Sequence, residues 1–170
     1  MLFGGVTVKK WSKKNIGMIL TLALAVGFSI GTGVRFVYEA VVFKPYEWKS
    51  PPIIMNCYGD DFSELQLTRA IEYWALRGYS IGFYEMNPPE MVCKSDDDLE
   101  GFIILRKTPQ SAVDATTLAA TTRTTVLTRV LSSTIRFTPG SQNLDLIIEH
   151  ELGHAFGFMH IEEEGHIMYP

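Results

Sequence analysis

The stretch from His150 to His160 reads HELGHAFGFMH and concentrates a residue type that binds metals. All four histidines of the 170-residue chain fall between positions 150 and 166. On a helix, positions four apart lie on one face, so His150 and His154 would direct two imidazoles at one point. Imidazole nitrogens arranged in this way bind zinc. The spacing therefore predicts a zinc site with two ligands on one helix.

A third ligand is expected because catalytic zinc sites usually have three protein ligands and one open position. Only 16 residues follow His154, which leaves little chain for a ligand on a later helix, and His160 is the natural candidate. Gly157 can adopt positive φ, end the helix and turn the chain so that His160 reaches the metal. His166 is the alternative third ligand.

Glu151 lies between the two helical histidines and would place a carboxylate beside the metal without binding it. Such a carboxylate can take a proton from a zinc-activated water and pass it to a leaving amine. The pattern therefore predicts hydrolysis rather than zinc storage, with Glu151 as the general base.

The sequence HELGHAFGFMH followed by IEEEGHIMYP resembles the metzincin zinc-endopeptidases, and most closely the matrixin branch, through HExxHxxGxxH and a Met-turn. The resemblance implies that the same three histidines hold one catalytic zinc and that Glu151 is the base. It implies that Met168 forms a hydrophobic floor beneath the metal. It also implies a peptide or protein substrate, held as an added strand against an edge strand within residues 119–131.

The order of apolar patterns and turn residues predicts an α/β or α+β sandwich of a sheet and two helices. The resemblance implies the α+β form, a metzincin-like twisted mixed sheet with two helices. Ser63 and Gln66 form a capping box for a first helix that Gly78 would end, and a second helix is expected from near Asn143. The expected strands are Ile53–Cys57, Ser80–Glu85, Gly101–Lys107, Thr121–Leu131 and Ser133–Phe137.

The first part of the chain has the pattern of a membrane anchor. Residues 16–34 contain no charge and, as a helix, would roughly match a hydrocarbon core of about 30 Å. Four lysines precede them, which predicts a cytoplasmic N-terminus. We expect a cytoplasmic basic segment (1–14), a transmembrane signal anchor (15–35), a linker (36–52) and an extracytoplasmic catalytic domain (53–170). A cleaved signal peptide, giving a secreted protein, and a helix in the core of a soluble domain are the alternatives.

The cysteines and charged residues of the C-terminal part suggest a possible disulfide and a possible calcium site, and they do not favour nucleic-acid binding. Cys57 and Cys93 are the only cysteines, and they form either one disulfide or two buried thiols. The acidic run from Asp96 to Glu100 is either a calcium-binding loop or a solvated turn. Residues 50–170 carry eight Lys and Arg against 17 Asp and Glu, which gives no electrostatic support for nucleic-acid binding.

The sequence thus predicts a zinc-dependent endopeptidase anchored at a membrane. A catalytically weak, zinc-containing binding module is the main alternative, because the chain ends two residues after Met168, where metzincins normally continue into a pocket wall. A hydrolase of small amide substrates is a third possibility. Cleavage assays separate the three.

Overall fold

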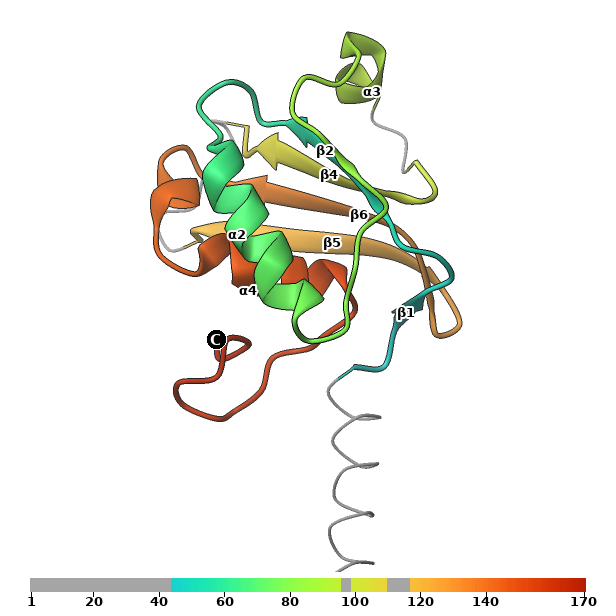
Figure 1. Ribbon diagram of the computed structural model, residues 1–170, viewed down its shortest axis with the longest axis vertical. Helices are drawn as coiled ribbons and strands as arrows, with labels where there is room; N and C mark the ends of the chain where they lie inside the picture. The colour runs from blue at the N-terminus through green and yellow to red at the C-terminus, as the bar shows by residue number, and fades with distance from the viewer. Residues whose placement is uncertain (1–43, 96–98, 110–116) are drawn as a thin grey trace, which may run out of the picture. The chain divides into compact units, whose positions relative to one another are not determined.

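The computed structural model describes residues 44–95, 99–109 and 117–170, which form an α+β domain (Figure 1). This confirms the predicted fold class at the level of α+β. The predicted basic segment and anchor, and Asp96–Asp98 of the possible calcium loop, lie outside the described residues. In the described part of the chain, no helix is long and apolar enough to span a bilayer.

Six strands of the described chain form one sheet that is mostly parallel. Its order is β1-β6-β4-β2-β3, and β5 pairs antiparallel with β6. Among the described strands β5 pairs only with β6, so β5 is an edge strand. The strands are β1 Glu47–Trp48, β2 Ile53–Cys57, β3 Tyr84–Glu85, β4 Phe102–Lys107, β5 Ala119–Val126 and β6 Arg129–Phe137.

Of the five predicted strands, only Ile53–Cys57 has the predicted bounds. The strand predicted at Gly101–Lys107 begins one residue later, and the one predicted at Ser133–Phe137 begins four residues earlier. The predicted strand Thr121–Leu131 is wrong as a single element, because the chain reverses between β5 and β6. Leu127 at this reversal has a φ of 55°, a left-handed conformation that strands do not contain. The predicted strand Ser80–Glu85 is reduced to the two residues of β3.

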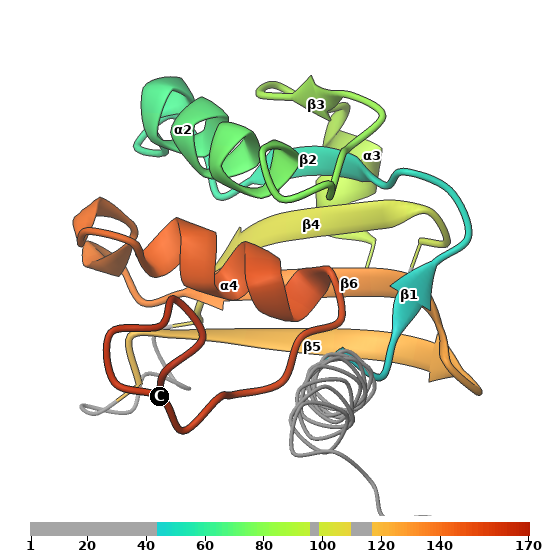
Figure 2. The ribbon, with the colours of Figure 1, turned by 60° about the horizontal axis from the view of Figure 1, so that its bottom comes forward.

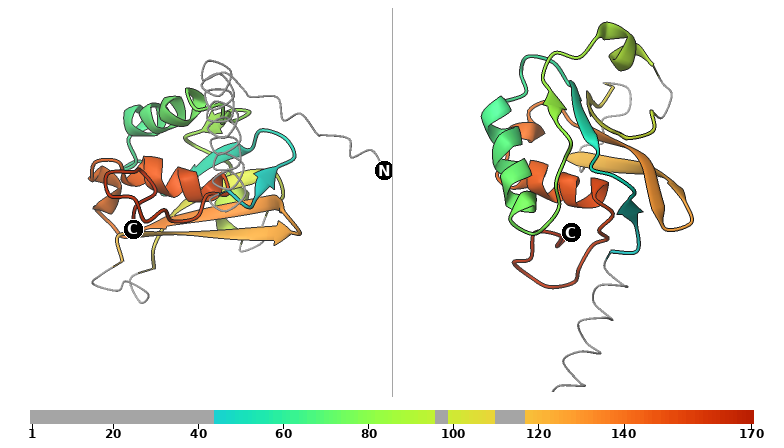
Figure 3. Two further views of the ribbon diagram at one scale, coloured as in Figure 1. Left: turned by 90° about the horizontal axis from the view of Figure 1, so that it is seen from below. Right: turned by 45° about the vertical axis from the view of Figure 1, so that its right-hand side comes forward.

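Two helices lie on the same face of the sheet, α2 Glu64–Ala75 and α4 Ile147–Ala155 (Figures 2 and 3). The capping box prediction is confirmed in part, because the Ser63 hydroxyl accepts a hydrogen bond from the Gln66 backbone N–H at 3.4 Å. Trp74 of α2 is 2% exposed, and its indole N–H donates to the Glu149 carbonyl of α4 at 2.7 Å. The two helices and the sheet therefore enclose one apolar core.

A third helix, α3 Glu90–Lys94, corrects the prediction of two helices. It begins directly after Pro89, whose fixed φ suits the start of a helix. Cys93 of α3 forms a disulfide with Cys57 at the end of β2, with 5.2 Å between their Cα atoms. The bridge attaches this short helix to the sheet.

The helix that carries the metal-binding motif begins at Ile147, later than predicted. Residues Ser141–Asn143 form a 3-10 turn instead of its first turn. Leu146 then has a φ of 64°, so α4 cannot extend back through that position. The carbonyl of Leu146 accepts the hydrogen bond from the His150 N–H, at 2.9 Å.

The segment predicted as a linker contains part of the folded domain. Its described residues include β1, which pairs parallel with the start of β6. The Trp48 indole N–H donates to the carbonyl of Ala155, the last residue of α4, at 2.8 Å. Among the described residues, the folded unit therefore includes residues 44–52 as well as those from Ile53 onward.

Candidate metal centre

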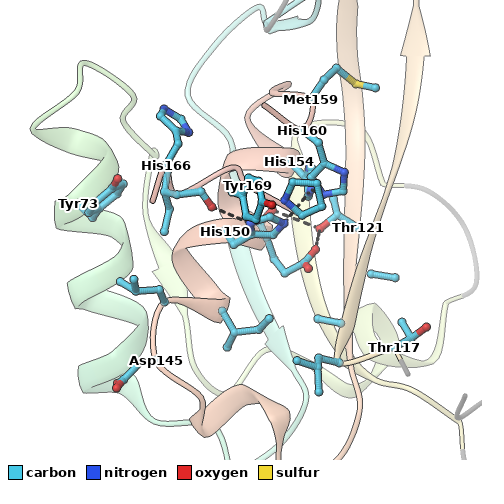
Figure 4. A pocket seen from close by; sticks show the side chains of 18 of the residues that line it. Tyr73, Thr117, Thr121, Asp145, His150, His154, Met159, His160, His166 and Tyr169 are labelled. Atoms are coloured by element: carbon cyan, nitrogen blue, oxygen red, sulfur yellow. Dashed lines mark hydrogen bonds between the residues drawn. The ribbon is translucent and has the colours of Figure 1, made fainter. Parts of the chain in front are cut away.

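Three histidine side chains converge at one point beside α4, and together they can hold a metal ion. The Nε2 atom of His154 lies 3.1 Å from Nε2 of His150 and 3.0 Å from Nε2 of His160 (Figure 4). The one-turn separation of the first two histidines places both rings on one side of α4, as the sequence predicted. His160 reaches them from the chain that follows the helix.

The spacing of these nitrogens fits a single ion. Two nitrogens bound to one tetrahedral zinc at about 2.0–2.1 Å lie about 3.3 Å apart. The two measured Nε2 separations differ from this value by only a few tenths of an ångström. Small rotations of the rings would bring the three nitrogens to binding distance of one metal.

The protonation of two of the rings also favours a cation. Nδ1 of His150 lies 2.7 Å from the Ile167 carbonyl, and Nδ1 of His154 lies 3.0 Å from the Phe158 carbonyl. A carbonyl can only accept, so each Nδ1 carries the hydrogen and each neutral ring presents a lone pair at Nε2. Two lone pairs then face each other at 3.1 Å. A cation between them would replace this repulsion by two bonds.

The surroundings of His154 and His160 favour the neutral imidazole, the form that binds metals. Burial is the main cause that lowers the pKa of His154 to about 4; the hydrogen bond to the Phe158 carbonyl acts against it, and positive charge on His150, His160 and Arg123 adds to it. Burial lowers the pKa of His160, and positive charge on His150 lowers it to a smaller extent. Both shifts favour the neutral ring, and for His154 the Phe158 carbonyl keeps the hydrogen on Nδ1.

Glu151 lies in the same cleft, and its residue is 4% exposed. Burial raises the pKa of its carboxyl group, while a hydrogen bond from Thr121 and the nearby His150 act in the opposite direction. The Thr121 hydroxyl lies 2.5 Å from Oε2 of Glu151 and 3.2 Å from the Glu151 carbonyl. Within the described residues, no hydrogen bond reaches the other carboxylate oxygen, Oε1.

Gly157 ends the metal-binding helix with a φ of 107°, as the sequence predicted. A second property of this glycine was not predicted. A Cβ at this position would lie 2.2 Å from the Tyr46 carbonyl oxygen, so the segment before β1 packs directly on the turn. The turn between the second and third ligands is therefore fixed both by its own backbone conformation and by this segment.

Met168 is fully buried beneath α4. Its sulfur lies so close to Gly153 that a Cβ on that residue would be only 2.3 Å away, and only glycine permits this contact. The Met168 carbonyl accepts from the Ile161 N–H at 2.9 Å, which ties this segment to the residues after His160. The neighbouring Ile167 carbonyl orients His150.

The three histidines open onto a cleft of about 980 Å³, bordered by β5, α4 and the C-terminal segment. Its apolar lining includes Leu118, Ala119, Leu146, Ile167 and Tyr169. His166 also borders the cleft, but its ring points away from the three converging rings, and its Nδ1 accepts from the Met168 N–H (Figure 4). The alternative with His166 as third ligand is therefore not favoured.

Sequence reasoning missed two residues of the site, Thr121 and Arg123 on β5. The Arg123 guanidinium donates to the carbonyls of His154 and Phe158, the latter at 3.1 Å. It also lies over the Tyr46 ring, with its Cζ atom 5.2 Å from the centroid. Alternation along a strand would have placed the two side chains on one face, but nothing in the sequence indicates which face meets α4.

Comparison of the sequence with protein families and with curated proteins gives no match. The candidate function therefore rests on the motif and on the geometry of the site.

Proposed function

We propose that the protein is a zinc-dependent endopeptidase of metzincin type. The observation that carries the proposal is the convergence of three Nε2 atoms beside a buried carboxylate in an open cleft. His150, His154 and His160 would hold the zinc ion. Nitrogen-only ligation by three imidazoles, leaving one position open, is typical of catalytic zinc.

Each protein group has a distinct task in this reaction. When bound, zinc supplies a Lewis acid that makes water easier to deprotonate and polarises the scissile carbonyl. Glu151 accepts the proton of the attacking water and donates it to the leaving amine, which makes it the general base and then the general acid. Burial raises the pKa of its carboxyl group, which makes the carboxylate a stronger base and so favours the first transfer, from the water.

The edge strand β5 would bind the substrate. It borders the cleft beside the three histidines, and its outer edge has no strand partner among the described residues. A peptide in extended conformation can add to such an edge through backbone hydrogen bonds, while pockets select its side chains. The apolar residues around the cleft favour apolar side chains next to the scissile bond.

We infer that the domain works outside the cytoplasm, attached to a membrane. The Cys57–Cys93 disulfide supports an oxidising compartment, where such bonds persist. The uncharged segment 16–34 supports attachment through a single N-terminal span. No nucleic acid is expected among the partners, given the excess of acidic residues.

The experiment that tests the function is digestion of a peptide library by the full chain, with zinc and with a chelator. Glu151→Gln keeps the size of the side chain but removes the base. It should retain zinc and lower the cleavage rate by about 10²-fold or more. Lys49→Ala, a change on an exposed residue outside the cleft, is the matched control and should cleave normally. Equal cleavage by Glu151→Gln and the parent chain would show that the assigned base is wrong.

A zinc-containing binding module is the second candidate. It is favoured by the apolar side chains exposed around the cleft, including Leu146 at 52%, Leu118 at 49% and Tyr169 at 47%. Such side chains can bind a protein partner without cleaving it. A module of this kind would bind library peptides with zinc present and leave them intact.

A further inference from the structure

The cleft contains two contacts that neither the motif nor the proposed reaction accounts for, and both come from one strand. Thr121 and Arg123 lie two positions apart on β5, so their side chains project from the same face of the sheet. Both are less exposed than Thr122 between them, in agreement with a face turned towards α4.

Thr121 contacts the proposed base itself. Its hydroxyl lies 2.5 Å from Oε2 of Glu151 and can donate one hydrogen (Figure 4). A glutamate side chain has three rotatable bonds between its Cα atom and its carboxylate. A hydrogen bond to one carboxylate oxygen therefore restricts the orientation of the whole side chain. With Oε2 engaged, Oε1 is the oxygen that can face a water molecule in the cleft.

Arg123 contacts the backbone at and after the second proposed metal ligand. Its guanidinium donates to the Phe158 carbonyl, which is the same oxygen that accepts from Nδ1 of His154. It also donates to the His154 carbonyl in the last turn of α4, which accepts from the Gly157 N–H as well. A positive charge at a helix C-terminus is favourable as well. Arg123 therefore fixes both the orientation of His154 and the start of the turn that leads to His160.

We propose that Thr121 and Arg123 are positioning residues for the two halves of the site: Thr121 orients the carboxylate of Glu151, and Arg123 orients the second metal ligand. The first half rests on the proposed function, and the second rests only on metal binding. The edge strand β5 would thus bind the substrate through its backbone and position Glu151 and His154 through its side chains.

The two residues should fail in different ways when changed. Thr121→Val keeps the shape of the side chain and removes the hydroxyl. We expect kcat to fall by on the order of tenfold, with KM and zinc affinity unchanged, whereas Thr121→Ser should restore kcat. Arg123→Gln should instead lower zinc affinity by on the order of tenfold, measured by competition with a chromogenic chelator. Thr68→Val makes the same chemical change on α2, outside the cleft, and should leave all three quantities unchanged.

A purely structural role would give another pattern. Thr121→Val and Arg123→Gln would then lower the melting temperature and zinc affinity together, and Thr121→Ser would not restore kcat. That result would overturn the proposal, as would parental kcat in Thr121→Val.

A measurement that does not require cleavage keeps the proposal separate from the proposed function. The ¹³Cδ resonance of Glu151, assigned with Glu151→Gln in the zinc-loaded full chain, should shift in Thr121→Val and stay in place in Thr121→Ser. An unchanged resonance in Thr121→Val would overturn the Thr121 contact. If the contact is present but the parent chain cleaves no peptide, the positioning role stands and the endopeptidase assignment fails.

Discussion

Gly153 in the middle of the HELGH motif offers a stringent test of the packing beneath the metal site, because two effects of Gly153→Ala have opposite signs. Alanine is about 1 kcal/mol more favourable than glycine in a helix interior. A loosely packed helix would therefore be stabilised by this substitution. The structure predicts the reverse.

The new Cβ would lie 2.3 Å from the sulfur of Met168 and 2.6 Å from a ring carbon of Trp74. Neither neighbour can move away easily. Met168 is fully buried, and Trp74 is held by its hydrogen bond to the Glu149 carbonyl. Overpacking of this kind costs about 1–3 kcal/mol, and two close contacts place the cost near the upper end. After subtraction of the helix preference, we expect a net loss of about 2 kcal/mol in the free energy of unfolding.

Urea denaturation of the metal-free full chain measures this loss, provided that the m-value is unchanged. The double variant Gly153→Ala with Met168→Ala is the control, because removal of the methionine side chain makes room for the new methyl group. Its loss should be smaller than the sum of the two single losses by about 1 kcal/mol or more. The described packing would be refuted if Gly153→Ala were as stable as the parent chain. It would also be refuted if the losses of unfolding free energy in the two single variants added up in the double variant.

The remaining predictions concern the disulfide and the pH dependence of the metal-free protein. Cys57→Ser with Cys93→Ser should lower the free energy of unfolding by about 4 kcal/mol in urea, because the bridge closes a loop of 36 residues; a loss below about 1 kcal/mol would contradict this. Burial lowers the pKa of His154 from 6.5 to about 4, so the unfolded chain takes up this proton at a higher pH than the folded protein. This contribution to stability should therefore be retained above pH 6.5 and be lost as the pH is lowered towards about 4. In His154→Asn, the free energy of unfolding should depend less steeply on pH between pH 6.5 and 5. A steeper slope in His154→Asn would show that the ring is not buried as described.

The sequence predicted those features that depend on neighbours within one or two turns of chain. The convergence of His150 and His154 follows from helical periodicity, and the end of α4 follows from Gly157. The Ser63 cap of α2 and the approximate positions of β2 and β4 were predicted for the same reason, since periodicity and capping are local properties.

The predictions failed where local signals conflicted or were weak. The threonine-rich stretch has high β-propensity throughout, and propensity alone does not show the reversal at Leu127. The positive φ at Leu146, which delays the start of α4, is not a conformation that a leucine indicates in advance. The described part of the predicted linker belongs to the domain because β1 finds a partner 82 residues later in β6, by the pairing of Glu47 with Arg129.

Sequence by itself determined the type and spacing of the metal-binding residues, because imidazoles four residues apart on a helix must share a face. Only the tertiary structure decided how these residues are oriented. The Ile167 and Phe158 carbonyls that fix two ring tautomers, and the β5 side chains that hold Glu151 and the ligand turn, come from segments brought together by the order of the strands. That order is set by long-range packing, whose free energy is distributed over the whole core and is not expressed in any short stretch of sequence.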